Sequence, residues 1–284
     1  MKGTTPSIFQ GQNLRKPSKA APAIAVRGLS SGYGKGVHAR EILHDISLDI
    51  QPGSFTVIVG PNACGKSTLL KTMARLLPAS AGVIEVEGRK LGSFGTKELA
   101  REMAFLPQSP ITPESIVVKD LVSRGRYPHQ GLIRQWSRAD EIAVQEAMRQ
   151  AGIVQLQDRL VQELSGGQRQ RVWLALVLAQ QTPIVLLDEP TTYLDVTHQL
   201  QVLDVARDLQ RAGKTVVAVL HELSLAFRYA TNLVVMKEGN VVASGPVEHV
   251  VSPELVSDIY EVDCELLSDP RTGRPVLVPY TLGL

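Results

Sequence analysis

The 284-residue sequence has little of what several classes of protein require. It contains only two cysteines, Cys64 and Cys264, so we expect no disulfide framework. No apolar run approaches the roughly eighteen residues that a membrane-spanning helix needs. Its 30 basic side chains nearly balance its 28 acidic ones, which leaves no electrostatic surface for nucleic acid. Residues 1–22 are polar and lack the apolar stretch of a secretion signal, so we expect a disordered tail on a soluble intracellular protein.

What the sequence does contain is an alternation of strand and helix patterns. Two segments, AIAVRGLSSGYG and EILHDISLDIQPG, alternate apolar and polar residues and predict antiparallel strands. The apolar runs FTVIVG, PIVLLDEP and KTVVAVLHE are typical of buried strands, and KSTLLKTMARLL and HQLQVLDVARDLQRAG have helical spacing. Helical signals dominate residues 96–179. The sequence therefore predicts an α/β fold with a mostly parallel core, an antiparallel β subdomain and an inserted helical subdomain.

The segment GPNACGKST lies between a predicted strand and a predicted helix and matches the phosphate-loop pattern. Gly60 and Gly65 would let the backbone turn its N–H groups toward phosphate oxygens at a helix N-terminus. Lys66 would reach the β and γ phosphates, Ser67 would ligate Mg²⁺, and Thr68 would donate to the α phosphate. A chance glycine turn is the alternative, which the strand–helix context disfavours. The predicted nucleotide-binding residues are Gly60, Pro61, Asn62, Ala63, Cys64, Gly65, Lys66, Ser67 and Thr68.

Two acidic residues end the apolar run PIVLLDEP. Asp188 would hold Mg²⁺, directly or through water, because a carboxylate at the end of a strand beside the loop strand lies next to the phosphates. Glu189 follows where the strand ends at Pro190, and we predict that it is the general base for the attacking water. A solvated acidic loop is the alternative, but it leaves two carboxylates after five apolar residues unexplained.

A second anion-binding turn is predicted in LSGGQRQR. Ser165, Gly166, Gly167 and Gln168 open a predicted helix, where a hydroxyl and backbone amides can hold phosphate. One nucleotide does not need two such turns in one chain. The pattern makes sense if this turn closes on a nucleotide bound by another copy, so we expect a head-to-tail homodimer with two nucleotides between the subunits.

Over about residues 23–250, these motifs resemble those of ATP-binding-cassette (ABC) ATPases. The resemblance implies an ABC-type P-loop NTPase fold that uses ATP and Mg²⁺, with residues 251–284 as a C-terminal helix and strand extension. It also implies that Gln108 in FLPQSP joins the core to the helical subdomain and acts at the metal and in catalysis, and that Asp195 in YLDVTHQ belongs to the nucleotide site. Further along the chain, His221 would hold the γ phosphate and the attacking water.

Some of these assignments have simpler alternatives. Tyr33 in SGYG matches the aromatic residue that stacks on adenine in the family, but it could only pack a turn. Gln108 could be a surface amide, and His221 a core histidine. Glu222 departs from the family pattern, in which aspartate usually follows the histidine. Cys64 stands where the family commonly has glycine, and its place in the loop predicts sensitivity to thiol reagents.

The segment VSRGRYPHQGLIRQWSRADEIAVQEAM closely resembles the corresponding part of ATP-binding subunits of bacterial ferric-siderophore importers. The core of that likeness is Arg124, Gly125, Arg126, Tyr127, Pro128 and His129, which would also fit a proline turn ending a helix. The resemblance implies a peripheral subunit on the cytoplasmic face of the bacterial inner membrane. It would bind integral membrane permease subunits and depend indirectly on a substrate-binding protein. Vitamin B12 import, haem import and a regulatory ATPase without cargo are alternatives.

Overall fold

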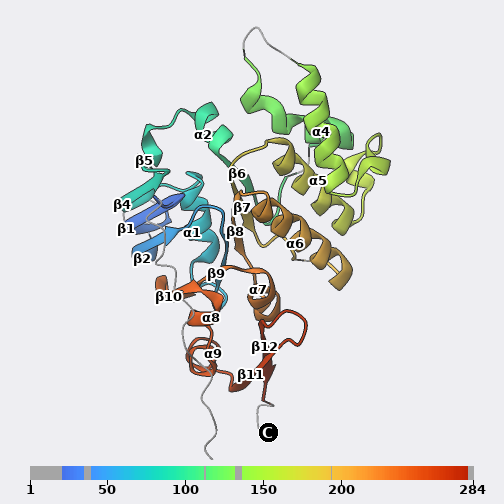
Figure 1. The fold of residues 1–284 in the computed structure, drawn as a ribbon. Coiled ribbons are helices and arrows are strands. Elements are labelled where there is room, and N and C mark those ends of the chain that lie inside the picture. Colours follow the sequence, from blue (N-terminus) through green and yellow to red (C-terminus); the bar gives the residue numbers. More distant parts are fainter. Residues whose placement is uncertain (1–20, 35–39, 112, 132–135, 193, 281–284) are drawn as a thin grey trace, which may run out of the picture.

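The computed structural model describes residues 21–34, 40–111, 113–131, 136–192 and 194–280. Its centre is a six-stranded sheet with the order β10-β9-β3-β8-β7-β6, parallel except between β9 and β10 (Figure 1). Its strands are β3 (Phe55–Val59), β6 (Met103–Leu106), β7 (Ile184–Asp188), β8 (Thr215–Val219), β9 (Asn232–Lys237) and β10 (Asn240–Pro246). Strands β3, β7 and β8 are buried along their whole length, as a sheet covered on both faces requires. The predicted α/β core is confirmed.

Helices on the two faces of this sheet form two apolar clusters. Successive residues of a strand point to opposite faces, so Val57 of β3 packs into one cluster and Ile58 into the other. The Ile58 cluster includes Leu69 and Leu70 of α1. The Val57 cluster includes the buried faces of α5, α6 and α7. These helices are α1 (Lys66–Met73), α5 (Gly166–Ala179), α6 (Val196–Arg211) and α7 (Leu223–Tyr229).

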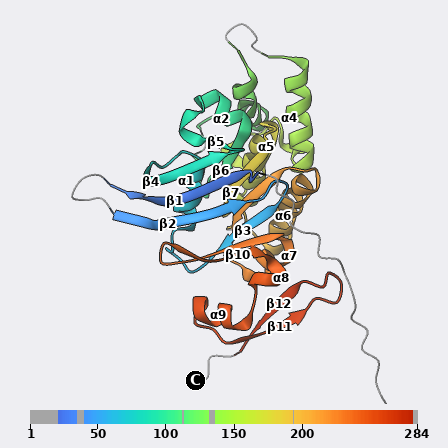
Figure 2. The ribbon, with the colours of Figure 1, turned by 60° about the vertical axis from the view of Figure 1, so that its left-hand side comes forward.

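The predicted antiparallel subdomain is a separate four-stranded sheet with the order β2-β1-β4-β5. Strand β1 pairs antiparallel with both β2 and β4. The strands are β1 (Ile24–Tyr33), β2 (Arg40–Ile50), β4 (Ala79–Val86) and β5 (Arg89–Lys90). Its buried side chains join the cluster that contains Ile58, so α1 packs between this sheet and the central one (Figure 2). Helix α1 ends at Met73, before the predicted stop near Leu77, because Arg75 adopts a left-handed backbone with φ 58°.

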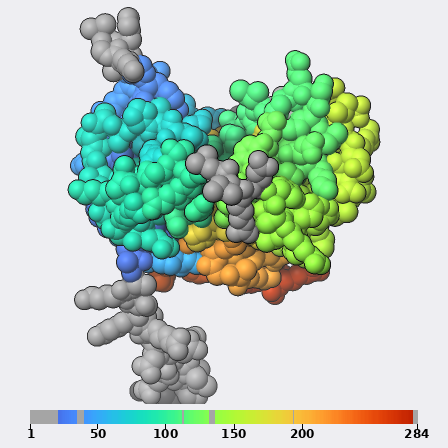
Figure 3. Space-filling model, turned by 90° about the horizontal axis from the view of Figure 1, so that it is seen from above, coloured from blue at the N-terminus to red at the C-terminus, as the bar shows by residue number. Residues whose placement is uncertain are grey.

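The predicted helical insertion contains one strand of the central sheet. Strand β6 pairs in parallel with β7, and Ala104 and Leu106 are buried there, so the helices that leave the core follow β6. The short helix η2 (Leu91–Ser93) precedes this region, whose helices are α2 (Thr96–Glu102), α3 (Val118–Ser123), η3 (Arg124–His129), α4 (Arg138–Gln150), η4 (Val154–Leu156), η5 (Val161–Glu163) and α5. Seen from above, the green residues of α3, η3 and α4 and the blue-to-teal residues form two lobes side by side (Figure 3).

The segment 124–129 forms the short helix η3 and is held to α4 and α5. The guanidinium of Arg126 is buried and donates to Asp140 Oδ1 at 2.9 Å, to Ala179 O at 2.7 Å and to Gln181 Oε1 at 2.9 Å. Gly125 lies so close to α5 that a Cβ atom there would be 2.3 Å from Leu176 O. The proline turn that we considered as an alternative reading of this segment is therefore present.

The C-terminal part contains two short helices and a strand hairpin. The elements are α8 (Val247–Val250), α9 (Pro253–Tyr260), β11 (Cys264–Ser268) and β12 (Pro275–Pro279), the last two antiparallel. The division of the chain at residues 22 and 250 stays a prediction, and the predicted disordered tail lies almost wholly outside the described residues. Within the described parts of the chain, no helix is both long and apolar enough to span a bilayer.

Candidate functional site

The phosphate loop connects β3 to α1 in a conformation that its glycines permit. Gly60 has φ 150° and Gly65 has φ 102°. A Cβ atom on Gly60 would lie 2.1 Å from the carbonyl oxygen of Met236, so only glycine fits at that position. The Lys66 side chain is buried and points back into the loop, where Nζ donates to Gly60 O at 2.9 Å and to Pro61 O at 2.8 Å. The loop therefore surrounds an ammonium group that can meet phosphate.

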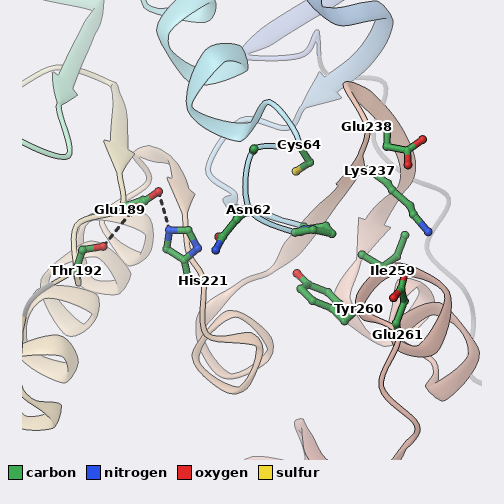
Figure 4. A pocket seen from close by; sticks show the side chains of 13 residues that line it. Asn62, Cys64, Glu189, Thr192, His221, Lys237, Glu238, Ile259, Tyr260 and Glu261 are labelled. Atoms are coloured by element: carbon green, nitrogen blue, oxygen red, sulfur yellow. Dashed lines mark hydrogen bonds and ion pairs between the residues drawn. The ribbon is translucent and has the colours of Figure 1, made fainter.

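Two cavities adjoin this loop. A cavity of about 300 Å³ combines Tyr33 of β1 with the loop and with the acidic end of β7. Its lining residues are Tyr33, Arg40, Ile42, Asn62, Ala63, Cys64, Gly65, Lys66, Ser67, Thr68, Glu189 and His221. A larger cavity, of about 900 Å³, lies between the loop, Glu189 and helix α9 (Figure 4). The smaller cavity has an aromatic ring, 47% exposed, at one end and the loop amides at the other, which suits a base attached to phosphates.

The carboxylate of Asp188 is fully buried at the end of β7. Neither of its oxygens accepts a hydrogen bond from the described residues, and the Lys71 ammonium lies 3.7 Å from Oδ2. Burial raises the pKa of Asp188, and the nearby Ser67 hydroxyl and Lys71 offset only part of that rise. Unpaired carboxylate oxygens beside a serine hydroxyl are ligands that Mg²⁺ accepts. The donor set therefore fits the predicted metal, with the remaining positions left to water and phosphate oxygens.

Glu189 lies at the meeting point of three other polar side chains. Its Oε1 is 2.6 Å from Nε2 of His221, and its Oε2 accepts a hydrogen bond from Thr192 Oγ1 at 3.1 Å (Figure 4). The same Oε2 also accepts a hydrogen bond from Nε2 of Gln108. The backbone of Glu189 adopts φ 52°, a left-handed conformation that is uncommon outside glycine. The left-handed turn at the end of β7 brings Glu189 beside the same cavities as the phosphate loop. The structure thus brings together Gln108, Glu189 and His221, three of the predicted catalytic residues.

The second anion-binding turn opens α5 away from both cavities. Ser165 is the N-cap of α5, and Ser165 and Gln168 form a reciprocal capping box: Ser165 Oγ accepts from Gln168 N at 3.3 Å, and Ser165 N donates to Gln168 Oε1 at 3.1 Å. Asp195 similarly caps α6, where it accepts from His198 N at 2.9 Å. Both caps are exposed, and neither lines the two cavities. This placement is compatible with a turn that serves another copy's nucleotide, which stays a prediction.

The structure gives a different expectation for Cys64 from the one that its position in the sequence suggested. The thiol is 5% exposed, and burial raises its pKa, an effect that nearby Lys66 only partly opposes. Thiol reagents react with the thiolate, so a buried thiol with a raised pKa reacts slowly. Sensitivity to such reagents is therefore no longer expected.

Sequence reasoning missed several residues at the site. Arg40 and Ile42 line the nucleotide-sized cavity because Arg40 pairs with Tyr33 across β1 and β2. The signal was present in the alternating pattern of β2, but it required the register of that hairpin. Thr192 and Tyr260 line the larger cavity from a turn and from the C-terminal helix. No sequence pattern connects Tyr260 with the loop, because their contact depends on where α9 packs.

The comparisons with known proteins agree with this site. A family model described as "ABC transporter" matches residues 43–192. The chain is 46% identical over 252 residues to the ferric enterobactin transport ATP-binding protein FepC of Escherichia coli, covering 88% of this chain and 92% of that one. It is 40% identical over 267 residues to the hemin import ATP-binding protein HmuV of Streptomyces coelicolor, covering 93% and 95%.

Solved structures give the same family. An inward-facing metal-chelate type ABC transporter matches with a TM-score of 0.77 at 25% identity, covering 92% of this chain and 98% of that one. The dimeric cassette MJ0796 bound to ADP and Pi matches with a TM-score of 0.71 at 25% identity, covering 79% and 98%. Because the family model covers more than half of the chain and these relatives match nearly all of it, the chain belongs to the ATP-binding subunits of ABC transporters, which are ATPases.

Proposed function

We propose that this chain is the ATPase subunit of a bacterial importer that powers the uptake of a ferric siderophore. The observation that carries the ATPase part is the position of Glu189, which lines both cavities beside the phosphate loop and contacts His221. The cargo is supported by relatives that are named for ferric enterobactin and petrobactin transport and are 46% and 44% identical to this chain. The relatives named for hemin import are 37–40% identical, so haem is a second candidate.

Each polar residue at the site has a role in this proposal. Tyr33 stacks on adenine, the loop amides and Lys66 hold the phosphates, and Glu189 accepts a proton from the attacking water. His221 holds the γ phosphate and orients that water. Ser67, Asp188 and Gln108 would hold Mg²⁺, which when bound supplies positive charge to the β and γ phosphate oxygens.

Hydrolysis in this proposal requires two copies. The Ser165 turn and Asp195 are exposed and lie outside the chain's own cavities, so they are free to complete the nucleotide site of a second subunit. Two copies then close head to tail on two ATP molecules and reopen after hydrolysis. Their partners are integral membrane permease subunits, bound at the cytoplasmic face of the inner membrane near the junction that contains Gln108, with a substrate-binding protein that delivers cargo to the permease.

Transport assays test the cargo directly. Cells that carry either the wild-type chain or Lys66→Ala would be given radiolabelled iron in a panel of ferric siderophores, with labelled haem and vitamin B12 alongside. Selective loss of one siderophore's uptake in the variant is the expected result. Loss of haem or vitamin B12 uptake with intact uptake of the ferric siderophores would mean that haem or vitamin B12 is the cargo instead. No change, in cells without a second ATPase able to substitute, would contradict a role in transport.

The catalytic role of Glu189 has its own test. Glu189→Gln keeps the shape of the side chain but removes its basicity, so hydrolysis should fall by about 10²- to 10⁴-fold. The variant should accumulate as an ATP-bound dimer, measured by size-exclusion chromatography with and without ATP. Ser165→Arg is the matched variant, because it should prevent dimer formation while the monomer still binds ATP. Wild-type hydrolysis by Glu189→Gln would refute the assignment.

A further inference from the structure

The first turn of α6 contacts the turn that opens α5. His198 on α6 donates from Nδ1 to Asp195 Oδ1 at 2.7 Å, and this hydrogen bond orients the ring beside Gly167. A Cβ atom added to Gly167 would lie 3.6 Å from Cγ of His198 and 3.5 Å from Cδ2 of Leu194, so these two side chains leave little more than the space of one methyl group beside the glycine. Helices α5 and α6 also lie side by side (Figure 1). A displacement of the Ser165 turn toward α6 would therefore close this narrow space and press on the start of α6.

The next residue of α6 contacts a different part of the site. Gln199 donates from Nε2 to Oε1 of Glu222 at 2.9 Å. Glu222 occupies the N-cap position of α7, where a carboxylate of suitable length accepts hydrogen bonds from the first amides of the helix. Its side chain makes no such bond. The carboxylate instead reaches α6, so the loop before α7 is connected to the first turn of α6.

This loop also carries the histidine of the catalytic cluster. His221 precedes Glu222 and contacts Oε1 of Glu189 through Nε2. The His221 side chain is 40% exposed, so few packing contacts fix its position and its neighbours in the chain matter more. Apart from the narrow space beside Gly167, the contacts run from the start of α5 through the first turn of α6 and Glu222 to His221.

We propose that Gln199 and Glu222 are positioning residues that couple the two ATP sites of the dimer. The inference rests on the head-to-tail dimer of the proposed function, in which the Ser165 turn meets the partner's nucleotide while His221 serves the chain's own. Nucleotide at one site moves the Ser165 turn, the first turn of α6 follows, and the Gln199–Glu222 hydrogen bond moves His221 toward or away from the γ phosphate. A parallel contact, from Gln170 Nε2 to Pro190 O at 3.1 Å, links α5 to the turn after Glu189 and makes the coupling through Gln199 partial.

The test measures ATP hydrolysis against ATP concentration by the full chain reconstituted with its permease. With two coupled sites, the wild-type Hill coefficient should lie above 1 and approach about 2. Gln199→Ala and Glu222→Asp should move it toward 1 and lower kcat roughly two- to tenfold, as expected for the loss of one hydrogen bond. Glu222→Gln keeps the length and an acceptor oxygen, so it should keep the cooperativity. Gln201→Ala, at an exposed position on the same helix, is the control and should change neither quantity.

Glu222→Asp separates positioning from general stability. Aspartate is short enough to cap α7 but too short to reach Gln199, so its unfolding midpoint should equal or exceed that of the wild type while cooperativity falls. Unchanged cooperativity in Glu222→Asp, or an equal loss in Gln201→Ala, would overturn the inference. A non-cooperative wild type that hydrolyses ATP would overturn it too, and would leave the proposed function intact. A wild type without ATPase activity would instead refute the proposed function.

Discussion

Replacing Asp188 with asparagine should stabilise the nucleotide-free protein and abolish its response to Mg·ATP. Asparagine preserves the shape of the side chain and removes a buried negative charge. That charge has one nearby cation, Lys71, at 3.7 Å. Such a pair attracts by about 4 kcal/mol at an effective dielectric constant of 20. Since the Lys71 side chain is 35% exposed, water screens part of that attraction.

The free-energy cost of burying the Asp188 charge opposes its attraction to Lys71, and we expect this cost to be the larger of the two. Transfer of a carboxylate into a protein interior costs several kcal/mol, and burial is the largest cause of the raised pKa of Asp188, to which the nearby Glu189 carboxylate adds. We expect Asp188→Asn to raise the free energy of unfolding by about 1 kcal/mol, which corresponds to an increase of roughly 2–4 °C in Tm. Because the folded pKa is raised, the penalty is absent below the unfolded pKa and grows as pH rises through the folded pKa. The stability that Asp188→Asn gains over the wild type should therefore decrease toward acidic pH.

Mg·ATP should reverse this order, so that the wild type becomes more stable than Asp188→Asn. At 100 times its Kd, a ligand stabilises the folded protein by about 2.7 kcal/mol, and only the wild type should gain this from Mg·ATP relative to ATP with a chelator. Thermal unfolding of both proteins in the two conditions and over a pH series measures each difference. Lower stability of Asp188→Asn without nucleotide would refute the reasoning, because it would mean that the carboxylate is already satisfied within the protein.

Three further predictions concern residues with different surroundings. Arg126→Ala leaves Asp140 buried with its Ser137 hydrogen bonds but without its charged partner, and should cost about 3 kcal/mol of stability in chemical denaturation. Replacement of the exposed Arg124 by alanine should change stability by less than about 0.5 kcal/mol, and equal effects of the two variants would contradict a stabilising role of the buried ion pair. Cys64 in the native protein should react with an alkylating reagent far more slowly than in denaturant. Mass spectrometry measures the labelling, and fast labelling of the native protein would contradict this expectation. Tyr33→Ala should weaken ATP binding about 5- to 100-fold by calorimetry, as expected for the loss of base stacking, whereas Tyr33→Phe should bind normally. Normal binding by the alanine variant would remove Tyr33 from the site.

Local sequence patterns predicted the parts of the fold that depend on local physics. Strand β3, the phosphate loop and α1 follow from a buried apolar run, glycines and helical spacing, and Asp188 and Glu189 follow from their place at the end of β7. Strand β6 was missed because its four residues lie among helical signals and become a strand only by pairing with β7. The role of Arg126 was also hidden, since its partners Asp140 and Ala179 are distant in sequence. Long-range packing decides such contacts.

The contacts of Glu189 have a consequence for the idle protein. Histidine, glutamine and threonine side chains from three segments surround the carboxylate, and the side chain is only 9% exposed. A water molecule that approaches to give up a proton meets a carboxylate on which three of about four lone-pair positions already have a partner. The side chain of His221 is 40% exposed, so it has room to move away from Glu189. On the proposed role of Glu189 as the general base, these donors oppose proton transfer until one of them moves away.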